Sequence, residues 1–188
     1  MGIRGIFKIA APAALLAVSL SAAAHPQAGG AHTHGFWQGF AHPFTGLDHL
    51  LAMLAVGIWS VRQGQGRALP LTFVGMMLIG VLTGVAGLEI PALETGIALS
   101  VALLGCLIAA AVRLPAAASA VLVGTFAVLH GNAHGHELPQ VASAFGLLAA
   151  SLVLLAAGRG AARLSPALWV KLSGAAIAAT GVMLVANA

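Results

Sequence analysis

Two short clusters hold most of the side chains in this chain that could bind a metal ion. The first runs from His42 to His49 (HPFTGLDH), and the second runs from His130 to Glu137 (HGNAHGHE). Both lie within or beside long apolar stretches, where an ionisable side chain is costly and therefore indicates function. Imidazole and carboxylate groups together suit divalent transition metals. The sequence therefore predicts a membrane protein that handles such an ion.

The spacing of the first cluster predicts a shared face. His42 and His49 are seven residues apart, which is two helical turns, provided that one helix extends through both. Pro43 suits the first turn of such a helix. Asp48 points about 100° away from His49 by the helical repeat. It can therefore bind the metal from the side or hold the ring N–H of a neighbouring histidine.

The second cluster has the same property on another helix. His130, His134 and Glu137 follow one another at spacings of four and three residues, so they share one face, whereas His136 points elsewhere. The two clusters together supply six candidate residues of a metal site: His42, Asp48, His49, His130, His134 and Glu137. Four further candidates are His25, Met53, Glu94 and His136.

The composition assigns the chain to the membrane. Hydrophobic residues make up 60% of the 188 residues and charged residues 6%, whereas soluble domains carry about 25% charged residues. A chain this apolar must have lipid as its solvent. Eight basic residues against four acidic ones form no basic stripe, so nucleic-acid binding is excluded. The single cysteine, Cys106, can make no intrachain disulfide.

The N-terminal 24 residues have the pattern of a secretory signal peptide. Arg4 and Lys8 precede a short apolar run, and small residues end at Ala24, after which we expect cleavage. The alternative is an uncleaved anchor helix, although the apolar run is short for one. After cleavage the chain would begin at His25, whose α-amine and imidazole could chelate a metal together.

The rest of the chain predicts an all-α, polytopic membrane protein, a bundle of six transmembrane helices. Residues 25–41 are polar and rich in Gly, and they read as an exposed, histidine-bearing segment before a membrane domain at 42–188. Continuous apolar runs near the ~20 residues that a bilayer needs must be helical, because lipid offers no hydrogen bonds to the backbone. The expected spans are 42–61, 68–87, 92–112, 116–136, 139–158 and 166–186.

The basic residues predict the orientation of these spans. Arg62 and Arg67 lie between the first two spans, Arg113 lies between the third and fourth, and Arg159 and Arg163 lie between the last two. The positive-inside rule places these loops in the cytoplasm. Both termini of the mature chain are then periplasmic, in agreement with a signal peptide, and both clusters lie in the outer half of the membrane.

The residues of both clusters resemble a known family. HPFTGLDHLLAMLAVG, from His42 to Gly57, is similar to the HPxxGxDHxxxM signature of the HupE/UreJ family of nickel permeases. LHGNAHGHE, from Leu129 to Glu137, resembles the family's HGxAHGxE signature, with Leu129 where Phe is expected, and ETGIALSVALLG, from Glu94, resembles its third-span segment. The resemblance covers nearly the whole mature chain.

The resemblance implies secondary uptake of Ni²⁺, or of Co²⁺, across the bacterial cytoplasmic membrane, in support of hydrogenase or urease maturation. Carried over by motif position, the functional residues are the six candidates above, with Glu94 added. The metal would be the transported substrate, so no permanently bound cofactor and no enzymatic activity are expected. The chain lacks the P-loop pattern GxxxxGK[ST], so no ATP hydrolysis is expected of it, and no ATPase subunit is required.

Two alternatives to a permease follow from the same residues. His130 and His134 have the two-histidine spacing of a zinc enzyme, so an intramembrane metal-dependent hydrolase is one. The sequence lacks the HExxH order of such enzymes, however, since Asn132 and Ala133 offer no general base between the histidines. The other is a membrane-anchored metal sensor or chaperone, for which six spans are more than an anchor needs.

Overall fold

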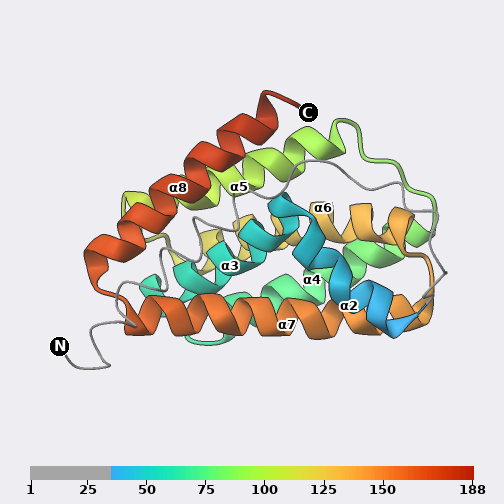
Figure 1. Cartoon of the computed structure of the whole chain (residues 1–188), viewed down its shortest axis with the longest axis horizontal. Helices are drawn as coiled ribbons and strands as arrows, with labels where there is room; N and C mark the ends of the chain where they lie inside the picture. The colour runs from blue at the N-terminus through green and yellow to red at the C-terminus, as the bar shows by residue number, and fades with distance from the viewer. Residues whose placement is uncertain (1–34) are drawn as a thin grey trace.

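The computed structural model describes residues 35–188, and within this range the chain forms seven helices and no strand (Figure 1). The predicted signal peptide, its cleavage site and His25 lie outside the described residues. The helices are α2 (Phe36–Thr45), α3 (Leu47–Arg62), α4 (Ala68–Val85), α5 (Leu93–Ala109), α6 (Ala116–Glu137), α7 (Val141–Leu164) and α8 (Ala167–Val185).

Four of these helices are long and apolar enough to cross a membrane, namely α4, α6, α7 and α8, which have 18 to 24 residues each. The pair α2 and α3 forms a fifth candidate when the two are counted as one broken span. The remaining apolar helix, α5, has 17 residues. The all-helical, membrane-type architecture expected from composition is therefore present in residues 35–188.

The first predicted span is not the single straight helix expected over residues 42–61. Helix α2 already begins at Phe36, inside the segment expected to be exposed, and α3 follows it at an angle of 85°. The break lies at Gly46, whose backbone is extended (φ −90°, ψ 114°). The hydroxyl of Thr45 donates to the carbonyl of His42 at 2.7 Å and so satisfies an acceptor at the end of α2. Pro43 lies inside α2 instead of in the first turn of a longer helix.

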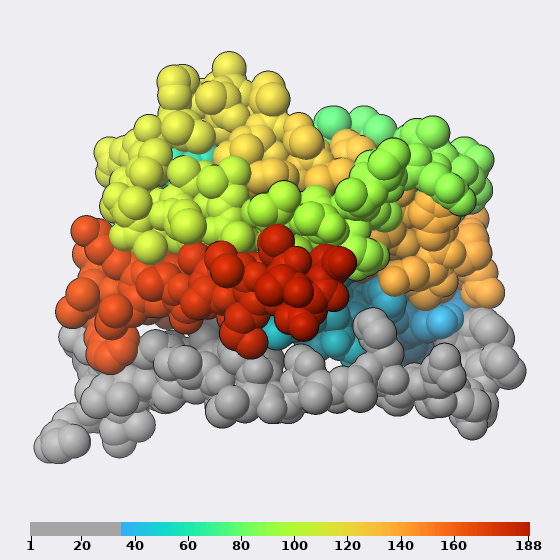
Figure 2. Space-filling view, turned by 90° about the horizontal axis from the view of Figure 1, so that it is seen from above, coloured from blue at the N-terminus to red at the C-terminus, as the bar shows by residue number. Residues whose placement is uncertain are grey.

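Helix α3 is the centre of the molecule and contacts α2, α4, α5, α7 and α8. Its side chains Met53 and Trp59 are fully buried. The other extensive contacts pair α4 with α6, α5 with α8, and α7 with both α2 and α3. Figure 1 shows α2 and α3 beside α7, and Figure 2 shows α8 lying against α5 along one side of the molecule.

Helices α4 and α6 touch backbone to backbone. A Cβ on Gly80 or Gly84 of α4 would overlap carbonyl oxygens of α6, and a Cβ on Gly131 or Gly135 of α6 would overlap carbonyl oxygens of α4. Small residues allow this close approach, which is how helices associate in lipid, where hydrophobicity gives no drive. The contact fixes the rotation of α6 about its own axis, and hence the direction of its histidines.

Candidate metal site

The first turn of α3 holds Asp48 and His49. One carboxylate oxygen of Asp48, Oδ1, accepts hydrogen bonds from the backbone N–H of His49 and from its ring Nδ1, both at 2.7 Å. An ionised carboxylate only accepts, so the ring proton of His49 is on Nδ1 and the lone pair is on Nε2. Nε2 is buried and has no hydrogen-bond partner. Asp48 thus orients His49, which is the second of the two roles that the sequence allowed for it.

His130 on α6 is held in a comparable way by α5. The hydroxyl of Ser100 donates to the carbonyl of Ile97 at 2.7 Å, and its oxygen lies 2.9 Å from Nε2 of His130. Because the one hydroxyl proton is used toward Ile97, Ser100 accepts, and Nε2 of His130 carries the proton. The lone pair of His130 is therefore on Nδ1, which is buried without a partner.

His134, one turn further along α6, has no hydrogen bond at either ring nitrogen although its side chain is 0% exposed. Its nearest carboxylate oxygen is Oε2 of Glu137, at 3.9 Å from Nδ1. That distance is too long for a hydrogen bond. Both ring nitrogens of His134 are therefore open to a ligand.

His42 and Glu137 form a closer pair at the edge of the cluster. Nε2 of His42 lies 2.7 Å from Oε2 of Glu137, and the two side chains are 29% and 50% exposed. Ligand atoms of His42, His134 and Glu137 all lie within 4.8 Å of one another, as the donor atoms of one metal ion do. These three residues come from two helices, α2 and α6.

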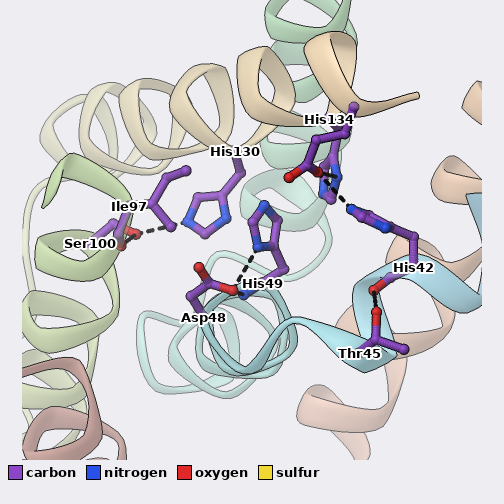
Figure 3. A network of polar contacts seen from close by, with 9 residues as sticks. His42, Thr45, Asp48, His49, Ile97, Ser100, His130 and His134 are labelled. Carbon is purple, nitrogen blue, oxygen red and sulfur yellow. Dashed lines mark hydrogen bonds and ion pairs between the residues drawn. The ribbon is translucent and has the colours of Figure 1, made fainter. Parts of the chain in front are cut away.

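The four imidazoles form a continuous group between α2, α3 and α6 (Figure 3). The ring of His49 lies 4.8 Å from that of His130 and 4.3 Å from that of His134, centre to centre, and the ring of His42 lies 5.0 Å from that of His134. Four of their buried nitrogens have no hydrogen-bond partner. Such atoms cost free energy unless a partner is present. A transition-metal ion, which binds imidazole lone pairs, is the partner that this chemistry fits.

Local structure explains why these side chains meet. On α6 the spacing of four and three residues puts His130, His134 and Glu137 on one face, as the sequence predicted, while the adjacent glycine face is held by α4. His42 and His49 are close, with rings 6.3 Å apart, but not because they share a helical face. The break at Gly46 separates them, so the expected two-turn geometry is wrong and the bend brings the rings together.

The other described candidates make no hydrogen bond or ion pair with this group. Glu94 is exposed in the first turn of α5 and takes part in none of the hydrogen bonds or ion pairs found among residues 35–188. Met53 is buried in the core of α3. His136 is exposed, with Nε2 3.1 Å from the carbonyl oxygen of Leu88. Sequence reasoning missed Ser100, because a serine in an apolar helix carries no signal of a partner 30 residues away.

The fold and the site together define the class: a multi-pass helical membrane protein with a buried cluster of histidines flanked by carboxylates. The sequence matches the family described as HupE / UreJ protein over residues 13–184, and the chain belongs to that family. A curated relative, "Protein HupE" of Rhizobium leguminosarum bv. viciae, is 40% identical over 181 residues, which cover 90% of this chain and 94% of the relative. No solved structure matches the chain.

Proposed function

We propose that this protein is a secondary transporter that takes up Ni²⁺, or Co²⁺, through the histidine cluster. Membership of the HupE/UreJ family supports a metal-uptake role. The observation that carries the proposal is the set of buried imidazole nitrogens without partners, on His49, His130 and His134. A protein that only needed these residues for packing would have paired those nitrogens with hydroxyl or N–H donors, or with a carbonyl where the nitrogen carries the proton.

The break in the first span supports transport further. Discontinuous helices line the substrate sites of many transporters, because irregular backbone is tolerated at membrane depth only beside protein or a cavity. Here the break at Gly46 separates His42 from Asp48 and His49, and all three face the same cluster. The broken span is thus part of the site.

In the proposed topology, the described helices make six spans, counting α2 with α3 as one and α5 as another. A cleaved signal peptide precedes them, and both mature termini are in the periplasm. This arrangement follows from the basic residues at the ends of the spans and in the loops beside them, which the positive-inside rule assigns to the cytoplasm: Arg62, Arg67, Arg113, Arg159 and Arg163. The histidine cluster then opens to the periplasm, from which the inner membrane protein takes its substrate.

In the proposed mechanism, imidazoles replace part of the hydration shell of the ion, and Glu137 and Asp48 offset its charge. The metal is substrate and is released, so each ligand must bind weakly enough to let it leave. Nitrogen and carboxylate donors favour Ni²⁺ and Co²⁺ over Mg²⁺ and Ca²⁺, which prefer oxygen ligands alone.

Uptake of radiolabelled nickel into proteoliposomes tests this function. We expect the wild-type chain to transport, and His49→Ala and His134→Ala to abolish uptake without loss of membrane insertion. His136→Ala is the matched control, because this histidine is exposed and outside the cluster. Normal uptake by both cluster variants would refute the site, and no uptake by the wild type would refute the function.

The same preparation separates the alternatives. A metal-dependent hydrolase is suggested by the group His42, His134 and Glu137, which has the two-histidine, one-carboxylate composition of some zinc enzymes. It predicts tightly bound Zn²⁺ with hydrolytic activity and no transport. A sensor or chaperone predicts metal binding with neither transport nor hydrolysis.

A further inference from the structure

The cluster divides into two groups that differ in exposure and in donor atoms. The outer group is His42, His134 and Glu137, in which the carboxylate and one imidazole are in contact with solvent. An ion in water reaches this group first, and the negative charge of Glu137 attracts it before its hydration shell is lost. The outer group therefore has the properties of a capture position.

The inner group is His49, His130 and His134. All three residues are buried, with exposed fractions of 7%, 0% and 0%, and adjacent rings lie 4.8 and 4.3 Å apart. Its available donors are imidazole nitrogens: Nε2 of His49, Nδ1 of His130 and either nitrogen of His134. Asp48 is bonded to the far side of the His49 ring, so it supplies charge through His49 instead of occupying the position itself.

The hydrogen bonds around the inner group fix which nitrogens are free. Ser100 receives the Nε2 proton of His130 because its own proton goes to Ile97, and this leaves Nδ1 as the donor atom of His130 (Figure 3). Asp48 likewise receives the Nδ1 proton of His49, and this leaves Nε2 as the donor atom of His49. His134 has no such partner, so neither of its nitrogens is committed.

We infer that the metal occupies two successive positions that share His134: a solvent-facing one with His42 and Glu137, and a buried one with His49 and His130, whose ligand atom Nδ1 is set by Ser100. This inference rests on the proposed uptake function and orders its first steps. The ion is captured with a carboxylate ligand and then moves to an all-imidazole position, with His134 in contact at both stages. Ser100 touches no metal and is a positioning residue.

The inner position also discriminates between ions. A buried site of imidazole nitrogens is unfavourable for Mg²⁺ and Ca²⁺, which would exchange oxygen ligands for nitrogen. The outer group has two imidazoles as well, but its carboxylate is a ligand that Mg²⁺ and Ca²⁺ accept. Selection is therefore stricter at the second position, after capture.

The test uses the full chain in proteoliposomes, with Ni²⁺ as the probe, and separates maximal uptake rate from half-saturating concentration. His130→Gln is the central variant, because the glutamine amide can still donate to Ser100 but replaces the imidazole Nδ1 by an amide oxygen, which is a weaker ligand for Ni²⁺. We expect a loss of about tenfold or more in maximal rate, with the half-saturating concentration little changed. Glu137→Gln should leave the maximal rate little changed and raise the half-saturating concentration about tenfold.

The positioning role of Ser100 is tested by removing its hydroxyl and by keeping it in a larger side chain. Ser100→Ala should lower the maximal rate about tenfold, and Ser100→Thr, which keeps the hydroxyl, should restore it. Ser151→Ala is the matched control, since Ser151 is equally buried and bonds a carbonyl of its own helix but no histidine. Loss in both Ser100 variants would overturn the positioning role, since the hydroxyl would then not be the cause.

Binding of Co²⁺ to the detergent-solubilised chain gives a readout that does not need transport. Occupation of the inner position predicts that His130→Gln changes the visible absorption of bound Co²⁺ toward a weaker ligand field, while Glu137→Gln leaves the spectrum unchanged at saturation. Identical effects of the two variants on spectrum and on kinetics would show a single position and overturn the inference. A wild-type chain that binds Co²⁺ with these spectra but transports neither ion would refute only the uptake function.

Discussion

The first and last turns of α3 both carry buried polar groups, but these groups differ in whether they have hydrogen-bond partners. At the first turn, Nε2 of His49 faces two other histidines and has no partner. At the last turn, Ser60 donates to the carbonyl of Gly57 at 2.7 Å and accepts from Arg159 at 2.9 Å. Beside it, the indole N–H of Trp59 donates to the carbonyl of Val112 at 3.2 Å.

Gln63, just beyond the last turn, completes the second arrangement. Its side chain donates to the carbonyl of Val112 at 3.0 Å and accepts from the backbone N–H of Leu114 at 3.1 Å. Arg159 also donates to the carbonyl of Gly66. This end of α3 is thus tied to the loops before α4 and before α6, with its polar groups paired.

The difference teaches what each end does. The chain is able to pair buried polar groups, so unpaired nitrogens at the other end mark a place where a ligand supplies the missing bonds. Paired groups stabilise the fold, and unpaired ones are kept for binding at a cost in stability. Substitutions at the first turn should therefore lower uptake without lowering stability. Substitutions at the last turn should lower stability without lowering uptake.

The largest expected effect is that of His134→Leu, which replaces an unpaired buried imidazole by an apolar side chain. Uptake should fall about 100-fold or more, because loss of a partner that only orients a ligand already costs about 10–100-fold. The metal-free chain should gain on the order of 1 kcal/mol in unfolding free energy, since the two unpaired nitrogens of His134 are removed. Uptake assays and thermal unfolding in detergent measure the two effects.

Added Ni²⁺ supplies the control for that experiment. It should raise the unfolding temperature of the wild type, because an ion bound to the folded state stabilises it by mass action, and it should leave that of His134→Leu nearly unchanged. If His134→Leu lost stability and kept uptake, the histidine cluster at the first turn of α3 would serve the fold and not the binding of the ion, which contradicts the comparison.

Asp48→Asn should have the next largest effect. The amide oxygen of asparagine can still accept the Nδ1 proton of His49, but the negative charge behind the ring is lost. We expect a decrease of about 10–100-fold in uptake with little change in stability. Glu89→Gln makes the same chemical change at an exposed carboxylate and should transport normally. Equal uptake by the two variants would contradict the role of Asp48.

Gly131→Ala tests how α6 is rotated. The added Cβ would overlap the backbone carbonyl of Met77 on α4, so the helices must separate next to His130. The expected costs are about 1–3 kcal/mol of unfolding free energy and about tenfold in uptake. Gly75→Ala is the control on α4, since a Cβ there meets nothing within 4 Å. Unfolding curves and uptake that match for both variants would show that the close approach is not required.

Some of this arrangement could be predicted from the sequence because it is local. The apolar runs predict helices, and the spacing of His130, His134 and Glu137 predicts their common face. The break at Gly46 was not predicted, because the seven-residue spacing of His42 and His49 also fits two turns of one helix, and one glycine is tolerated in helices. The bond between Ser100 and His130 depends on how α5 packs against α6, which no local pattern encodes.

Gln63→Ala should have the smallest effect and should act on stability alone. Losing this side chain leaves the carbonyl of Val112 with one fewer donor and the N–H of Leu114 without its acceptor. We expect a loss of about 1–2 kcal/mol in unfolding free energy, because both groups are partly accessible to water. The half-saturating Ni²⁺ concentration should stay unchanged, since Gln63 lies at the opposite end of α3 from the histidines.

Gln65→Ala is the matched control for this substitution, because the side chain of Gln65 takes part in none of the hydrogen bonds found among residues 35–188. Its unfolding free energy should equal that of the wild type. A Gln63 variant with weaker Ni²⁺ uptake and unchanged stability would show that the two ends of α3 are coupled in transport, because the paired end would then act on the ion and not on the fold.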